Sequence, residues 1–289
     1  MNIVDALLQG ILLGGQYALF AAGLSLMFGV MRLVNLAHGD IGVVAAYGAL
    51  AVVNVFVVSP VFALVVVLPA AALVGYVVQR LLLQRTLAPS PLPSLLVTFG
   101  LSIIIQNVLL MTMSADQQRL SLGPLDTAAI RIGDALRIGV FPLGVFLLAA
   151  IVLLALSLFT SRTQYGRLIR AVSDDPSTAE LSGVDPRRIY AVATAIAFAL
   201  VAIAGVASGI QTSFSPTSGS LFLIFAFEAV IIGGLGSVWG TLAGGIILGV
   251  AQTVGAAFAP AQQVLVGHLV FLLFLAFLPN GLSRKKVRA

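Results

Sequence analysis

The sequence contains no cysteine among its 289 residues. This absence excludes disulfide bridges, thiolate metal sites and thiol catalysis. Lysine is also scarce, because only Lys285 and Lys286 occur, close to the end of the chain. Neither lysine lies in a glycine-rich phosphate-binding loop, so no nucleotide-binding motif of that kind is present. No cofactor is therefore expected in this chain, and any ATP that drives its function must be bound by a partner.

Charged residues are equally few, at 9% of the chain against 60% hydrophobic residues. They gather in short islands, so that none lies between Asp5 and Arg32 or between Asp40 and Arg80. A hydrocarbon core about 30 Å thick requires roughly 20 apolar residues per helix, and a soluble protein could not cover so much apolar surface. The composition predicts an all-α polytopic membrane protein, with residues 1–289 forming a single transmembrane domain.

The apolar stretches between the islands are the candidate membrane spans. They cover residues 7–30, 41–58, 61–83, 95–113, 140–160, 189–211, 221–232, 238–258 and 264–278. The seventh stretch is short for a complete crossing, which indicates a short or broken helix near 221–236. We therefore expect roughly eight to nine transmembrane helices.

The basic residues predict the orientation of the chain. A net charge of +5 could suggest nucleic-acid binding, but these residues flank apolar segments, as they do on the cytoplasmic side of membrane proteins. Segment 161–188 holds five arginines and is expected in the cytoplasm. Segment 114–139, with three arginines and three aspartates, is then external. The N-terminus is expected outside and the C-terminus in the cytoplasm, with membrane lipid and not nucleic acid around the chain.

A polar cluster interrupts the apolar sequence between the first two candidate spans. Asn35, His38 and Asp40 lie within six residues, and Gly39 permits a sharp backbone turn. Irregular backbone at membrane depth is tolerated only where it is buried in protein or lines a wet cavity. The cluster is either a broken-helix segment beside a translocation pathway or an ordinary loop with its histidine among the lipid headgroups. One His and one Asp are too few for a metal site.

Three further polar residues lie inside apolar stretches. Glu228 belongs to the short seventh stretch, and a charge at the bilayer centre costs roughly 2.5–3.5 kcal/mol on insertion scales. It is a candidate pathway residue, or else it lies near one membrane interface or is satisfied by a neighbouring helix. Gln106 and Asn107 are weaker pathway candidates, because hydrogen bonding between helices explains such residues more simply.

The long cytoplasmic segment carries the signals of a short helix. Asp175 can act as its N-cap, Pro176 as its first residue and Gly183 as its left-handed C-terminal residue. A short capped helix in the only long cytoplasmic segment indicates a docking element for a soluble partner, although a solvated loop that fixes orientation is the simpler alternative. No constellation of catalytic residues is evident, so the chain is not expected to be an enzyme.

Several motifs in order along the chain resemble a known family, the permease subunits of high-affinity branched-chain amino acid ABC importers, and specifically the H-type member of the permease pair. The most specific is VNLAHGD at 34–40. The others are GQYAL at 15–19, GRLIRA at 166–171, GGLGS at 233–237, GGIILG at 244–249 and LPNGL at 278–282.

This resemblance implies a non-catalytic transport subunit in a bacterial-type inner membrane. Its implied partners are a second permease, two cytoplasmic ATPases and a periplasmic or extracellular substrate-binding protein. It also implies an ATPase coupling segment, which reads Ser177-Thr-Ala179 where other ABC importers have Glu-Ala-Ala. The residues assigned to this segment are Gly166, Arg170, Asp174, Asp175, Ala179, Glu180 and Gly183.

The sequence leaves alternatives open for the transported solute and for the energy source of transport. An apolar amino acid is the expected solute, because the candidate pathway offers few charges, but related permeases with these signatures carry urea or short amides. A stand-alone secondary transporter is a further alternative, in which Glu228 and Asp40 would carry protons.

Overall fold

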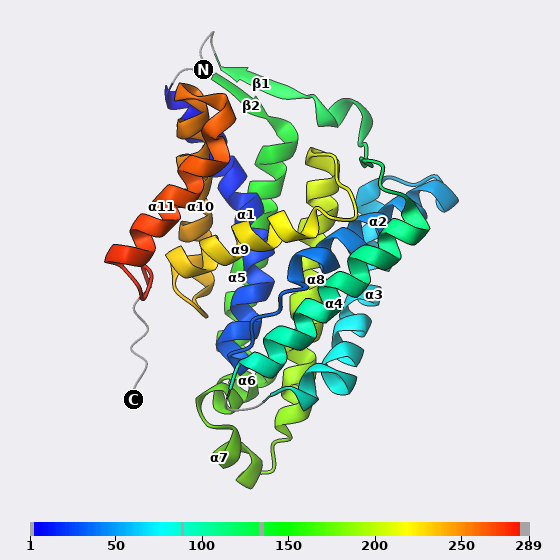
Figure 1. Cartoon of the computed structure of the whole chain (residues 1–289), viewed down its shortest axis with the longest axis vertical. Helices are drawn as coiled ribbons and strands as arrows, with labels where there is room; N and C mark the ends of the chain where they lie inside the picture. The colour runs from blue at the N-terminus through cyan, green and yellow to red at the C-terminus, as the bar shows by residue number, and fades with distance from the viewer. Residues whose placement is uncertain (1–2, 88–89, 133–135, 284–289) are drawn as a thin grey trace.

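The chain is almost entirely helical in the computed structural model, which describes residues 3–87, 90–132 and 136–283 (Figure 1). Its helices are α1 (Ile3–Met31), α2 (His38–Phe56), α3 (Pro60–Leu81), α4 (Leu92–Met113), α5 (Val140–Arg162), α6 (Gln164–Asp174), α7 (Pro176–Leu181), α8 (Pro186–Gln211), α9 (Gly219–Gly233), α10 (Val238–Phe258) and α11 (Gln263–Phe277). Within the described ranges, eight helical stretches are long and apolar enough to cross a membrane, when α3 and α11 are counted with the short 3-10 turns beside them as Pro60–Arg85 and Pro260–Phe277. The prediction of an all-α polytopic membrane protein is confirmed.

The predicted short helix near 221–236 is α9, which has 15 residues. At 1.5 Å of rise per residue it extends only about 22 Å, less than the roughly 30 Å of a hydrocarbon core. It ends at Gly233, and Gly234 follows with φ at +97°. The glycine-rich stretch after it is therefore a turn into α10 and does not prolong the helix.

Two elements in the segments between spans were not predicted. Segment 114–139 contains an antiparallel hairpin of β1 (Ala129–Ile132) and β2 (Leu136–Gly139), with Ala129 opposite Gly139. Segment 161–188 contains the 11-residue helix α6 before the predicted short helix α7. The search for long apolar stretches misses α6 because it is amphipathic, with Ile169 and Val172 buried and its other face polar.

Glycine contacts hold the centre of the bundle together. α1 is the central helix and packs against α5, α8, α9 and α10. A Cβ on Gly14 would lie 2.4 Å from the Cα of Ile246, and one on Gly249 would lie 2.3 Å from the carbonyl oxygen of Gly10. The backbones of α1 and α10 therefore touch, as small residues four apart allow in lipid.

The two ends of the molecule differ in what they carry. Figure 1 shows α6 and α7 at one end, and the β1–β2 hairpin together with the start of α1 at the opposite end. The two segments predicted to lie on opposite sides of the membrane therefore lie at opposite ends of the bundle. Between them, α4 and α9 pass in front of α8 and α1.

Candidate functional site

The polar cluster predicted between the first two spans lies inside the bundle. Asn35 and His38 are fully buried and Asp40 is 1% exposed. The His38 Nε2 atom is 2.9 Å from the carbonyl oxygen of Phe20, which precedes the end of α1 by 11 residues, or about 16 Å along the helix axis. The chain therefore turns back along α1 and begins α2 deep in the protein. This is the geometry of a broken-helix segment, because a loop at the headgroups would leave His38 exposed.

Two helices begin side by side at this point. A Cβ on Gly39 would lie only 1.9 Å from the carbonyl oxygen of Gly219, and one on Gly219 would lie 2.2 Å from Asp40 Oδ1. The first turn of α2 thus contacts the first turn of α9, and the Asp40 carboxylate lies between them. Helix N-termini carry partial positive charge and stabilise a nearby carboxylate. We call this contact the α2–α9 junction.

Gln106 of α4 joins the junction, whereas its neighbour does not. The Gln106 Nε2 atom donates to Asp40 Oδ1 at 3.0 Å and lies 3.3 Å from the hydroxyl of Ser220. Asn107 is exposed, and its amide donates to the Ile103 carbonyl of its own helix, at 2.8 Å. Of the residues predicted for the pathway, the fold therefore brings together Asn35, His38, Gly39, Asp40 and Gln106.

Glu228 belongs to a second buried polar group near the other end of α9. It is 4% exposed, and its Oε1 atom is 2.5 Å from His268 Nδ1 of α11. Phe225, one turn earlier on α9, stacks with His268 and also contacts the ring of Tyr17. The Tyr17 hydroxyl donates to Gln252 Oε1 of α10 at 2.5 Å.

Sequence reasoning identified only one member of this second group. His268, Gln252 and Tyr17 lie in other apolar stretches, separated from Glu228 by many residues. A polar residue inside a span was the available signal, as it was for Glu228. The pairing itself depends on how α1, α9, α10 and α11 pack, which no local pattern encodes.

The predicted coupling segment folds as two helices at one end of the bundle. A Cβ on Gly166 would lie 2.2 Å from the Phe159 carbonyl oxygen, so α6 lies directly against the end of α5. The Arg170 guanidinium donates to the Thr160 carbonyl, one of the unpaired carbonyls at that helix end. Gly166 and Arg170 therefore hold α6 in place, while Asp174 is exposed.

The predicted short helix α7 has the predicted caps. The Asp175 side chain accepts hydrogen bonds from the backbone N–H of Ser177 and Thr178, and Gly183 has φ at +82°. Hydrogen bonds from the Thr178 side chain and backbone hold the pKa of Asp175 below its ordinary value. Glu180 is exposed.

The exposed surface of α7 differs from the one that the motif suggested. The Ala179 side chain is 6% exposed and belongs to the core, whereas Leu181 is 90% exposed. Sequence reasoning missed Leu181, an exposed leucine on a short helix outside the spans. It offers a soluble partner an apolar contact.

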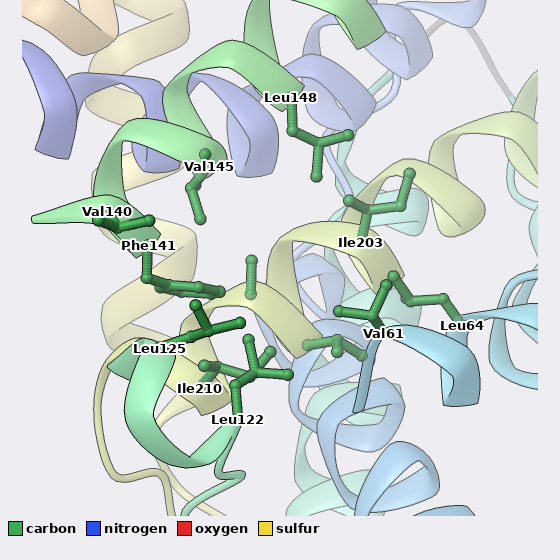
Figure 2. A pocket seen from close by; sticks show the side chains of 13 residues that line it. Val61, Leu64, Leu122, Leu125, Val140, Phe141, Val145, Leu148, Ile203 and Ile210 are labelled. Atoms are coloured by element: carbon green, nitrogen blue, oxygen red, sulfur yellow. The ribbon is translucent and has the colours of Figure 1, made fainter. Parts of the chain in front are cut away.

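A cavity of about 220 Å³ lies elsewhere in the molecule, between α3, α5 and α8 (Figure 2). The side chains labelled around it are all hydrocarbon, among them Val61, Phe141 and Ile203. A polar solute would find no side-chain hydrogen-bond partner there, and burying its polar groups would be costly. This cavity is suited to an acyl chain and not to a polar solute.

Comparison with known proteins places the chain in context. Residues 6–278 match the family described as the permease component of branched-chain amino acid transport systems. The chain is 29% identical to the high-affinity branched-chain amino acid transport permease BraD of Pseudomonas aeruginosa, over 97% of this chain and 95% of that protein. It is 25% identical to the corresponding permease LivH of Escherichia coli, over 98% and 96%. A solved structure of PsaBC from Streptococcus pneumoniae shares the fold, with a TM-score of 0.51 at 12% identity over 97% of this chain and 93% of that one.

Proposed function

This chain belongs to the family of permease components of branched-chain amino acid transport systems, and we propose that it forms part of the translocation pathway of an ATP-driven importer for apolar amino acids. Its broken helices support this role. The α2–α9 junction places two helix N-termini and one carboxylate deep inside the protein. In membrane transporters, discontinuous helices of this kind surround solute sites near the bilayer midplane.

The observation that carries the ATP-driven assignment is the capped helix α7 with its exposed Leu181. Family members are transport subunits, and the sequence has no phosphate-binding loop. We propose that two cytoplasmic ATPases hydrolyse ATP and that one of them binds α7. The chain itself then has no catalytic role.

The exposed polar residues in the spans are best explained by contact with a second permease. Asn107 and Ser220 are exposed and Gln106 is half-buried, all within or beside the spans. Lipid offers such side chains no hydrogen-bond partners, so they usually face protein or a water-filled cavity. We place the second permease against the face formed by α4 and α9, with the polar residues lining the pathway between the two chains.

The orientation follows from the same assignment. The end with α6 and α7 faces the cytoplasm, so the end with the β1–β2 hairpin faces outward and receives the substrate-binding protein. The N-terminus is then outside and the C-terminus in the cytoplasm. Urea or a short amide in place of the amino acid would keep this architecture unchanged.

The alternative is a stand-alone transporter driven by protons, and the Glu228–His268 pair is the observation that favours it. A carboxylate hydrogen-bonded to a histidine at membrane depth can carry a proton. The two candidate functions predict different assemblies and different energy sources.

The test begins with gentle solubilisation of the chain from its native membrane and identification of the co-purifying proteins by mass spectrometry. The co-purified complex and the isolated chain are then each reconstituted in liposomes. We expect two ATPases and a second permease, with L-leucine uptake that requires ATP. Uptake by the isolated chain under a pH gradient, without ATP, would support the proton-driven alternative. Co-purification of the importer subunits with uptake of urea but not leucine would change only the proposed identity of the solute.

A further inference from the structure

A second cavity, of about 320 Å³, lies between α1, the beginning of α9 and the end of α8. This volume is at the lower end of the roughly 300–1,000 Å³ typical of small-molecule sites. Its lining includes Gln16, Tyr17 and Phe20, which follow one another along one face of α1. Two of these belong to the sequence motif at 15–19, to which no function has yet been assigned.

One wall of the cavity is aromatic. The rings of Phe20 and Phe222 stack with their centroids 4.8 Å apart, and Phe225 lines the cavity beside Tyr17. Such a wall accepts an aliphatic group, because burying apolar surface is favourable by about 25 cal/mol per Å². The cavity of Figure 2, by contrast, is lined by apolar residues throughout.

The polar part of the lining is uncharged. Gln16, Ser208 and Ser218 contribute to it, with further hydroxyl and amide groups from the α8–α9 connection, and its described lining contains no Asp, Glu, Lys, Arg or His. A solute with a full charge on its side chain would find no counter-ion here. A solute whose charges balance can be held by the hydroxyl and amide groups.

Gln16 is a buried polar residue of this lining. Its side chain is only 6% exposed, and its Oε1 atom has no hydrogen-bond partner among the described residues. A buried acceptor left unpaired costs about 1–3 kcal/mol, and buried polar groups normally have a partner. This oxygen is itself enclosed by protein, so Nε2 is the end of the Gln16 amide that a solute in the cavity can reach.

The cavity also adjoins the α2–α9 junction, through Phe20 and through Ser218, which directly precedes Gly219. Phe20 lines the cavity with its ring, and its carbonyl oxygen is bonded to His38. Ser208 and Gln211 lie in the last turn of α8, which is at the end of the bundle away from α6 and α7 (Figure 1). The cavity therefore lies on the outward side of the junction.

We propose that this cavity is a binding site for the transported solute on the outward side of the pathway, selective for small zwitterionic or neutral solutes that combine a carboxylate or carbonyl group with an aliphatic group. Gln16 Nε2 and the hydroxyl groups donate hydrogen bonds to the carboxylate or carbonyl, and Phe20 and Phe222 bind the aliphatic part. The proposal rests on the proposed transport function and specifies the substrate class of its pathway.

Because the natural chain has no cysteine, single cysteines can be introduced without further change to this chain. In the complete importer, Ser208→Cys and Ser218→Cys would be treated from the outer side with a small membrane-impermeant thiol reagent. Labelling of this chain would be followed with L-leucine, acetamide or L-arginine present. The matched control is Ser25→Cys, which is equally buried in α1 but does not line the cavity.

We expect labelling at Ser208→Cys and Ser218→Cys that L-leucine slows several-fold and L-arginine does not, with Ser25→Cys unlabelled. In uptake assays, Gln16→Leu should raise the KM for leucine about tenfold, the loss of one hydrogen bond to a charged group. Gln79→Leu, a buried glutamine that contacts Thr194 instead, should leave the KM unchanged.

Normal leucine uptake without protection, and with the KM of Gln16→Leu unchanged, would overturn the cavity assignment and leave the transport function intact. Protection by acetamide in a complex that does not transport leucine would support the cavity and overturn the amino acid as the solute. Absence of both ATP-dependent uptake and protection would overturn the two proposals together.

Discussion

Single glycines decide how closely the helices around the candidate pathway approach. Gly39 and Gly219 let α2 and α9 meet with their backbones in contact, and Asp40 lies between them. Even one methyl group there would have to displace backbone and not a flexible side chain. The position of the carboxylate, and its bond to Gln106, therefore depends on residues that have no side chain.

Replacing Gly39 by alanine should separate α2 from α9. The added Cβ would lie 1.9 Å from the Gly219 carbonyl oxygen, and overpacking of this kind costs about 1–3 kcal/mol. We expect lower thermal stability of the purified complex and uptake reduced at least several-fold. Gly48→Ala in the same helix is the control, because its Cβ would meet only a Val67 methyl group at 3.8 Å. Equal behaviour of the two variants would refute the close contact.

The Glu228–His268 pair is expected to connect α9 to α11. His268→Phe leaves a buried carboxyl group without its partner, which should cost about 1–3 kcal/mol. Glu228→Gln keeps a hydrogen-bonding side chain and should lose less. The double change Glu228→Leu with His268→Leu should recover most of the stability, because it removes both partners. The measurement is thermal unfolding of the complex, and a His268→Phe protein as stable as the natural one would show that the pair contributes nothing.

At the scale of elements, the predicted coupling segment combines a fixed helix with an exposed one. α6 is held against the end of α5 through Gly166 and Arg170. α7 projects beyond it, and its geometry depends on the caps at Asp175 and Gly183. A movement applied to α7 by a partner can therefore pass through α6 to α5 and α1, which both contact α6.

Loss of the Asp175 cap should weaken this transmission. We expect Asp175→Ala to reduce the solute imported per ATP hydrolysed several-fold, whereas Asp174→Ala, an exposed neighbour that is not the N-cap of α7, should not. Because the pKa of Asp175 is lowered in the folded state, the stabilisation is complete above the unfolded pKa of aspartate. It is lost only as the pH falls through the lowered folded value. Coupling in the natural protein should therefore not depend on Asp175 titration near neutral pH.

Leu181 is expected to anchor the ATPase. Its side chain is 90% exposed, and burying a leucine at an interface contributes about 1.5–3 kcal/mol. Leu181→Ser should weaken ATPase retention during purification about tenfold or more, while membrane insertion stays normal. Leu125→Ser, at an exposed leucine outside α6 and α7, serves as the control. Retention unchanged in Leu181→Ser would remove this residue from the interface.

At the scale of the whole molecule, burial is uneven. In the most apolar windows of α1 and α8, 83% and 67% of residues are buried, whereas the figures for α4 and α11 are 17% and 6%. Lipid can cover the apolar part of that exposed surface. It cannot satisfy the polar side chains of α4 and α9, which is why a second permease is assigned to this face.

A cross-linking experiment tests that assignment. A photoreactive maleimide attached to Asn107→Cys should capture the second permease, identified by mass spectrometry. The same reagent on Val65→Cys, at a residue of α3 that is 72% exposed and surrounded by apolar residues, should capture lipid only. Capture of the second permease from Val65 and not from Asn107 would move the interface to α3.

The sequence by itself determined the features that depend on neighbouring residues. Hydropathy identified the membrane class, the long spans and the short α9, because each span must be apolar over its own length. Capping residues predicted α7 from Asp175 to Gly183, because caps act within one helical turn. The amphipathic helix α6 and the β1–β2 hairpin were missed, since neither has the long apolar run that the search followed.

Only the tertiary structure decided which polar residues meet. His38 bonds to Phe20, Gln106 to Asp40, Glu228 to His268 and Tyr17 to Gln252, and the last pair is 235 residues apart. The sequence marked Asn35, His38, Asp40, Gln106 and Glu228 as unusual in an apolar setting, but not their partners or the cavity beside Gln16. The physical reason is that contacts between helices depend on their packing, which glycine contacts between distant segments control, and no local pattern of residues encodes those distances.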